Sequence, residues 1–178
     1  GVDVQLGHFW HCAVGFRAGL ARLLSYGKLL TWGEICAKEE ELKIANPHWV
    51  FVDTTWSEKE VHSQCAERDW AAIRSTDRRY FPHPQKKGPP INRLYSEPRP
   101  IDLGIGTKES GRRHCTEFLM ASPATEDLLQ RYLDGKTGNF EIPQDVTPIF
   151  QKQMHARLRV PEYNKRTGKE TWIWKDLA

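Results

Sequence analysis

Several common sequence signals are missing from this chain, and each absence excludes a class of protein. No stretch approaches the roughly 20 apolar residues of a membrane span, and no basic head followed by an apolar run marks a signal peptide. The four cysteines are scattered with no CxxC pair, which excludes a zinc knuckle or a disulfide framework and favours a reducing, cytoplasmic setting. There is no GxxxxGK[ST] phosphate loop, so a P-loop ATPase is excluded from these residues.

The length and charge of the chain allow one domain with a substantial core. A chain of 178 residues buries roughly two-thirds of the surface that its unfolded form exposes. The formal net charge of +3 is compatible with a nucleic-acid partner but does not require one. Gly1 stands at the start of a predicted core strand with no residues leading into it, so we expect 1–178 to be a single domain excised from a longer protein.

The first half of the sequence predicts three antiparallel strands followed by alternating helices and strands. The predicted elements, in order, are strands at 2–4, 9–16 and 21–30, a helix over 31–45, a strand over 48–52 that ends at Asp53, a helix from Ser57 to about Asp69, and a strand over 70–73. Thr31 followed by Glu34 predicts a capping box, and Asn46-Pro47 predicts the end of that helix. The apolar run 48–52 is typical of a strand buried on both faces.

The second half begins with a long basic segment. Residues 74–100 hold seven Lys and Arg residues against Asp77 and Glu97, together with six prolines, which predicts a loop with no regular element. After it we expect a strand over 115–120, a helix over 122–133 capped by Ser122-Pro123 with Glu126, a helix beginning at Thr147-Pro148, and a hairpin of 158–163 with 170–174. The helix beginning at Thr147-Pro148 is expected to carry Phe150, Met154 and Arg157 on one side.

The basic loop offers a DNA-binding surface. Cationic side chains contact phosphates without reading the base sequence. The candidate residues are Arg78, Arg79, Lys86, Lys87 and Arg93. A solvated surface loop is the alternative.

Two aspartates stand where apolar strands should be buried. Asp3 lies between Val2 and Val4, and Asp53 ends the apolar run 48–52. A carboxylate in such surroundings is costly unless it is paired, hydrogen-bonded or bound to a cation. Two magnesium or manganese ions would remove that cost and supply phosphodiester hydrolysis. The alternative is that Asp3 pairs with a basic residue and that Asp53 merely caps the following helix through the Thr54 or Thr55 amide. His62, on the next helix, is a candidate proton shuttle, and a partly exposed helix residue is the alternative reading of it.

The order of these elements is that of the RNase H-like fold: α/β, with a central mixed sheet made of an antiparallel meander plus parallel strands, flanked by helices, and here a C-terminal hairpin. In that order the strand of Asp3 and the strand of Asp53 lie side by side. Chemistry in open α/β sheets collects where adjacent strand ends converge.

The sequence resembles, over nearly its whole length, the nuclease domain of tailed-bacteriophage terminase large subunits of the lambda-like branch. The elements that carry the resemblance are GVDVQ at 1–5, VFVD at 50–53 with Val61 and Cys65, Gly106-Thr107-Lys108, the FEIP element at 140–143, and FQKQM at 150–154 before a Trp-containing hairpin. Two positions depart from the family: Thr54-Thr55-Trp56 replaces the usual Ser-Gly, and the third metal-binding acid is expected beyond Ala178. Asp176 is the candidate for that acid within the chain.

The resemblance implies a two-metal-ion endodeoxyribonuclease that cuts concatemeric viral DNA during genome packaging in the host-cell cytoplasm. The full protein would carry an N-terminal ATPase. Its partners would be double-stranded DNA, the portal protein, the small terminase subunit and other large-subunit copies, with no membrane. The alternatives are another RNase H-like nuclease of the RNase H, resolvase or transposase type, or a catalytically silent nucleic-acid or assembly module.

Overall fold

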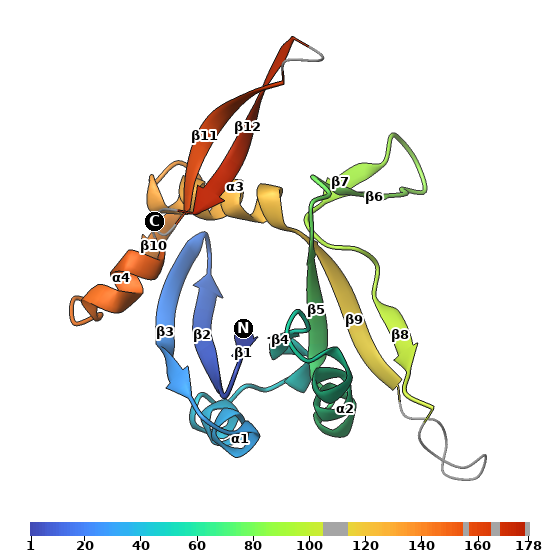
Figure 1. Cartoon of the computed structure of the whole chain (residues 1–178), viewed down its shortest axis with the longest axis vertical. Helices are drawn as coiled ribbons and strands as arrows, with labels where there is room; N and C mark the ends of the chain where they lie inside the picture. The colour runs from blue at the N-terminus through green and yellow to red at the C-terminus, as the bar shows by residue number, and fades with distance from the viewer. Residues whose placement is uncertain (105–113, 155–156, 165–167, 177–178) are drawn as a thin grey trace.

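The centre of the protein is an eight-stranded mixed sheet, seen in the computed structural model in Figure 1. The structure describes residues 1–104, 114–154, 157–164 and 168–176. The strands of this sheet, in spatial order, are β10 (Asn139–Glu141), β3 (Leu20–Leu29), β2 (His8–Arg17), β1 (Val2–Gln5), β4 (Phe51–Asp53), β5 (Ala71–Thr76), β9 (His114–Ala121) and β8 (Arg99–Asp102). The protein is therefore a mixed α/β domain, as predicted.

The predicted N-terminal meander is confirmed. β1 pairs antiparallel with β2, and β2 pairs antiparallel with β3. Gly7 has a φ of +74° in the first turn and Gly19 a φ of +81° in the second, a backbone conformation that glycine adopts without steric cost. Alternation of buried Val2 and Val4 with exposed Asp3 and Gln5 places one face of β1 on the core.

The strands after the meander run parallel to β1. β4 pairs with β1, β5 with β4, and β9 with β5, all in parallel register. The prediction that the strand of Asp3 and the strand of Asp53 are neighbours is therefore confirmed.

Two helices cover one face of the sheet. α1 (Trp32–Glu41) and α2 (Glu58–Arg68) contribute Ile35, Val61 and Cys65 to the main core. The strands contribute Val2, Val4, Phe9, Val52, Ala72 and Cys115 to the same cluster, and Val50 joins it from the position just before β4. We call this side the helix face. All four cysteines are free thiols, and Cys65 and Cys115 are buried in this core.

The opposite face is covered over β2 and β3 by the C-terminal part of the chain. α4 (Pro148–Met154) places Phe150 on Tyr26, with ring centroids 4.3 Å apart, and Val146 packs in the same cluster with Leu23. Thr147 caps α4, because its Oγ1 accepts from the Phe150 amide at 3.3 Å. β10 extends the sheet beyond β3.

The end of the first helix and the following strand differ from the prediction. α1 ends at Glu41 rather than Ala45, and Lys43 takes a φ of +51° just beyond it. Asn46 accepts from the His48 amide and starts a short 3₁₀ helix, η1 (Pro47–Trp49), so β4 holds only three residues. Proline fixes its φ near the helical value, which favours this turn over an extended strand. Phe51 is 37% exposed, so β4 is buried on one face only.

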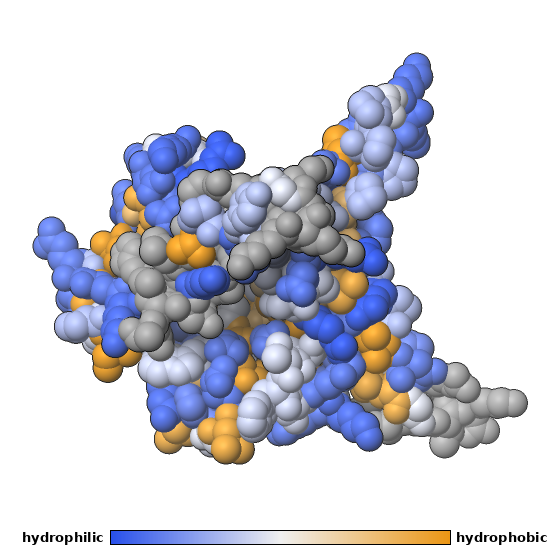
Figure 2. All heavy atoms as spheres, turned by 45° about the horizontal axis from the view of Figure 1, so that its top comes forward, coloured by the Kyte–Doolittle hydropathy of each residue, from blue (hydrophilic) through white to orange (hydrophobic). Residues whose placement is uncertain are grey.

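The prediction that residues 74–100 lack regular structure is wrong. β5 continues to Thr76, β6 (Phe81–His83) pairs with β7 (Ile91–Arg93), and β8 forms the edge of the main sheet. Pro82 lies in a two-stranded ribbon and Pro100 in an edge strand, positions where a missing amide hydrogen costs little. β6 and β7 project from the sheet as an arm, which is mostly hydrophilic at the upper right of Figure 2.

The C-terminal elements are largely as predicted. α3 (Ser122–Leu133) has the predicted bounds, but its cap differs: Ala121 is the N-cap, and the Ser122 hydroxyl makes no cap hydrogen bond. The predicted hairpin is β11 (Arg157–Asn164) with β12 (Lys169–Asp176), so Arg157 begins a strand and does not share the face of α4. Gly106-Thr107-Lys108 lies outside the described residues.

Among the described residues, none of the helices has both the length and the apolar content that crossing a membrane requires.

Candidate functional site

The two strand aspartates lie next to each other on the face opposite α1 and α2. Val2 is the register partner of Val52, so the following residues, Asp3 and Asp53, are neighbours across the β1–β4 pair. Val2, Val4 and Val52 point into the core under the helix face, so Asp3 and Asp53 point the other way. Asp3 is exposed and Asp53 half-buried. The pair predicted from the sequence is therefore brought together.

The surroundings of Asp3 disfavour its negative charge. Partial burial raises the pKa of Asp3, the hydrogen bond from the Gln5 side chain at 2.8 Å opposes that rise, and the nearby charge of Asp53 adds to it. His8, on the facing strand, acts in the lowering direction. The net result is a pKa above the ordinary aspartate value, with partial burial as the largest cause and the neighbouring Asp53 carboxylate as a smaller one.

Asp53 is held by the residue two positions further on. Its carboxylate accepts from the Thr55 amide at 3.3 Å and from the Thr55 hydroxyl at 3.0 Å. The Thr54 amide instead donates to the Ile73 carbonyl at 2.9 Å. Thr55 does donate to Asp53, but α2 begins at Glu58 with Ser57 as its N-cap, so Asp53 does not cap that helix. Asp3 accepts a hydrogen bond from the amide side chain of Gln5 rather than from a lysine or arginine.

The repulsion between Asp3 and Asp53 can be tested through the stability of the protein, with no assay of activity. We expect Asp3→Asn to raise the free energy of unfolding by about 0.2–1 kcal/mol in metal-free buffer, because like charges on facing strands destabilise a sheet by about that amount. The sign follows from the raised pKa: the folded protein binds the Asp3 proton more tightly than the unfolded chain, so stability falls as pH rises through the raised value. Thermal melts at neutral pH measure it.

Manganese should reverse the order of stability, so that the wild type becomes more stable than Asp3→Asn. An ion that binds only the folded state raises the melting temperature of the wild type in proportion to its occupancy. Asp3→Asn removes one of the two carboxylates and should show a smaller rise. Equal rises in both proteins would contradict metal binding by Asp3.

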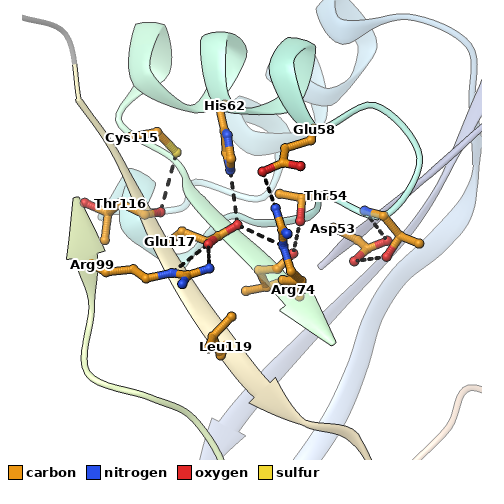
Figure 3. A network of polar contacts seen from close by, with 12 residues as sticks. Asp53, Thr54, Glu58, His62, Arg74, Arg99, Cys115, Thr116, Glu117 and Leu119 are labelled. Atoms are coloured by element: carbon orange, nitrogen blue, oxygen red, sulfur yellow. Dashed lines mark hydrogen bonds and ion pairs between the residues drawn. The ribbon is translucent and has the colours of Figure 1, made fainter. Parts of the chain in front are cut away.

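A second polar cluster lies on the helix face, around Glu117 of β9 (Figure 3). Glu117 is fully buried, and His62 of α2 is only 4% exposed. His62 Nε2 lies 3.1 Å from Glu117 Oε1, and Arg99 Nε donates to Glu117 Oε2 at 2.8 Å. Arg74 Nε lies 3.4 Å from Glu117 Oε1, and its guanidinium also pairs with Glu58. One carboxylate thus joins α2, β5, β8 and β9.

The charges of this cluster compensate one another. Burial raises the pKa of Glu117, but the hydrogen bonds from Arg99 and His62 and the charges of Arg99 and Arg74 outweigh burial, so its pKa lies below the usual glutamate value. The hydrogen bond to Glu58 is the largest of the effects that raise the pKa of Arg74. Glu117 is therefore ionised in the folded protein.

This cluster could also hold a metal ion. One ligand atom each from Glu58, His62 and Glu117 lies within 4.8 Å of the others. Arg74 and Arg99 already bind the same carboxylates, so an ion would have to displace guanidinium groups. That competition favours a structural ion-pair network at this position.

The sequence argument did not find Glu117, and neither of its two readings of His62 fits the structure. His62 is buried rather than partly exposed, and it turns toward Glu117 on the helix face (Figure 3), away from the side that Asp3 and Asp53 share. Alternation along 115–120 could have placed Glu117 on the same face as buried Cys115.

The predicted DNA-binding residues have different surroundings. Lys86 and Lys87 are exposed in the connection between β6 and β7. The guanidinium of Arg78 lies over the Phe81 ring at 5.7 Å, and an Arg79 nitrogen lies 3.8 Å from Asp127. Arg93 donates to Glu97 at 3.0 Å. The three arginines of this set thus contact an aromatic ring or an acid, whereas the two lysines lie exposed between the strands of the arm. Asp176 is in β12, paired with Arg157, and its side chain lies outside what the structure describes.

Comparison with known proteins gave no match: no protein-family model, no curated protein and no solved structure is similar enough to place this chain.

Proposed function

We propose that this domain is a metal-dependent nuclease with an RNase H-like fold, in which Asp3 and Asp53 bind two magnesium or manganese ions and hydrolyse DNA phosphodiester bonds. The observation that carries the proposal is the adjacency of the two aspartates on parallel neighbouring strands, on the same side of the sheet. The strand order β3-β2-β1-β4-β5, antiparallel and then parallel, supports the RNase H-like assignment.

The carboxylate oxygens of Asp3 and Asp53 are the kind of ligand that magnesium and manganese prefer. Divalent cations offset the repulsion between the two carboxylates and, when bound, activate a water and stabilise the leaving 3′ oxygen. Within the chain, Thr55 orients Asp53 and Gln5 orients Asp3 by the hydrogen bonds described above. Two acids are fewer than such sites usually need, and we infer that a further acid completes the site, either Asp176 or one beyond Ala178.

The biological setting we propose is the one that the sequence resemblance implies. The domain would be the nuclease part of a packaging motor that cuts concatemeric viral DNA in the host-cell cytoplasm, acting with a portal protein, a small terminase subunit and other copies of itself. Its formal charge of +3 and its basic arm, residues 77–93, fit a polyanionic substrate.

The experiment that tests the function is cleavage of supercoiled plasmid DNA in manganese, with EDTA as the control, using this chain and a version extended past Ala178. Metal-dependent cutting of plasmid supports the proposal. Cutting confined to RNA–DNA hybrids or to four-way junctions would favour an RNase H or a resolvase. An extended protein that binds DNA but cuts none of these substrates would favour a silent module.

The basic arm gives a separate prediction about affinity. Lys86→Ala with Lys87→Ala should weaken duplex binding and reduce the slope of log K against log salt by about 0.9 for each phosphate contact that is lost. The reason is counterion release, which depends on exposed cations. Filter binding over a salt series in EDTA measures it. Lys59→Ala with Lys43→Asn, which removes two exposed charges outside the arm, is the matched control, and an equal loss of affinity in both double variants would deny the arm a specific role.

A further inference from the structure

Asp3 and Asp53 are the middle of a row of side chains that crosses five adjacent strands. Asp3 pairs with Trp10 of β2, Asp53 pairs with Ile73 of β5, and Ile73 pairs with Phe118 of β9. Residues directly opposite each other on neighbouring strands share a face. Trp10, Asp3, Asp53, Ile73 and Phe118 therefore lie on the same side of the sheet, opposite α1 and α2.

Aromatic side chains stand on both sides of the two aspartates. The His8 ring meets Trp10 edge to face, with centroids 6.0 Å apart. On the other side Phe118 meets both Phe51 and Tyr95, each at 6.3 Å. Neighbouring strands lie about 4.8 Å apart. The backbone of Trp10 is therefore about one strand spacing from that of Asp3, and the backbone of Phe118 is about two strand spacings from that of Asp53.

These rings reach solvent. Phe51 is 37% exposed and Tyr95 is 51% exposed, while Trp10 and Phe118 are half-buried. An aromatic ring whose role is core packing is covered like Trp70, which is 1% exposed. Open rings beside a pair of carboxylates require a different explanation.

We propose that the two aromatic groups form a base-stacking site for unpaired nucleobases on either side of the phosphate that the aspartates address. This inference rests on the proposed nuclease function and adds that the bases on either side of the phosphate to be cut are unpaired when the strand is bound. Every base has an aromatic face that stacks on Phe, Tyr, Trp or His, whereas the bases of an intact duplex are stacked on one another.

The position of the basic arm fits the same occupant. β5 carries Ile73 of the row, ends three residues later at Thr76, and leads directly into the arm that carries Lys86 and Lys87 (Figure 1). A strand that stacks its bases across the row and continues toward the end of β5 therefore meets the arm, whose lysines can contact its phosphates further along. An apolar protein partner gains nothing from these lysines.

The test is binding in EDTA, so that no cleavage is needed. A fluorescent single-stranded oligonucleotide, as DNA and as RNA, is compared with the blunt duplex of the same sequence. We expect at least one single strand to bind about fivefold or more tighter than the duplex, since one stacked base contributes about that factor. Equal or tighter binding of the duplex would overturn the proposal, and the two single strands distinguish a DNA from an RNA substrate.

Variants assign the preference to the rings. Tyr95→Leu and Phe118→Leu remove an aromatic face and keep apolar bulk, and each should weaken single-strand binding about fivefold with little effect on the duplex. Phe16→Leu, at an exposed ring near the far end of β2, is the control. Tyr95, the most exposed of the set, tests the idea even if Phe118→Leu unfolds. Unchanged binding in Tyr95→Leu, or an equal loss in Phe16→Leu, would overturn it. Because cleavage is measured separately in manganese, failure here leaves the nuclease proposal standing.

Discussion

Asp3→Asn and Asp53→Asn should each reduce manganese-dependent cleavage on the order of a thousandfold while leaving DNA binding nearly unchanged. Losing one carboxylate weakens the metal ions that activate water and stabilise the leaving oxygen, a contribution of several kcal/mol to the transition state. Asparagine has nearly the same shape, and its side-chain oxygen can still accept from Gln5 or from Thr55. Initial rates of plasmid nicking, measured at saturating manganese, give the size of the effect.

The matched control for this experiment is Asp69→Asn. Asp69 is an exposed acid at the end of α2 with a φ of +62°, a conformation that asparagine tolerates well. It should retain wild-type cleavage and the wild-type melting temperature. Full activity in either Asp3→Asn or Asp53→Asn would remove that aspartate from the site. Equal losses in all three variants would indicate a general defect of the protein, and equal full activity in all three would indicate a contaminating nuclease.

The aspartate pair could be predicted because its signal is local and its placement follows from the order of elements. Asp3 and Asp53 each interrupt or end a short apolar run, and three antiparallel strands followed by a helix and a parallel strand place those runs side by side. The same reasoning overextended β4. The run 48–52 looks continuous in hydropathy, but Pro47 and the Asn46 cap turn its first residues into η1.

The structure of residues 74–100 could not be predicted for a different reason. Prolines and charges are depleted from strands buried on both sides, but β6, β7 and β8 are short, and β8 lies at an edge of its sheet. There Pro82 and Pro100 lose no ladder hydrogen bond that the fold needs. Edge strands carry a weak sequence signal because their composition resembles that of loops.

The ion-pair network of Glu117 was beyond prediction because the partners of this residue come from three other elements. The partners of Glu117 are distant in sequence: His62, Arg74 and Arg99 precede it by 55, 43 and 18 residues. The local sequence around Glu117 therefore does not predict which residues it pairs with. A glutamate in an alternating strand normally predicts an exposed face. Only the packing of α2 on β5 and β9 shows that this position is buried and fully paired.

That burial gives the second large expected effect: Glu117→Gln should lower the free energy of unfolding by about 3 kcal/mol. Removing one partner of a buried ion pair costs about 3–5 kcal/mol, because the remaining charges lose their compensation. The lower end applies here, since the side chains of Arg74 and Arg99 are 38% and 45% exposed and can turn toward water. Urea unfolding at neutral pH, with m-values compared between proteins, measures the change.

Two further measurements separate this network from ordinary surface charge. Glu141→Gln breaks the ion pair of Arg22 and Glu141, which joins two neighbouring strands. The two side chains are 61% and 44% exposed, so the loss should be at most about 1 kcal/mol.

The pH dependence of stability has a defined sign. The folded pKa of Glu117 is lowered, so its stabilisation is complete above the ordinary glutamate value of about 4.3 and is lost as pH falls through the folded value. Glu117→Gln should therefore lose less stability than the wild type on acidification below about pH 4. A Glu117→Gln protein as stable as Glu141→Gln would show that Glu117 does not hold α2, β5, β8 and β9 together. A large loss would establish that the helix following Asp53 and both ends of the basic segment, at Arg74 and Arg99, depend on one buried carboxylate.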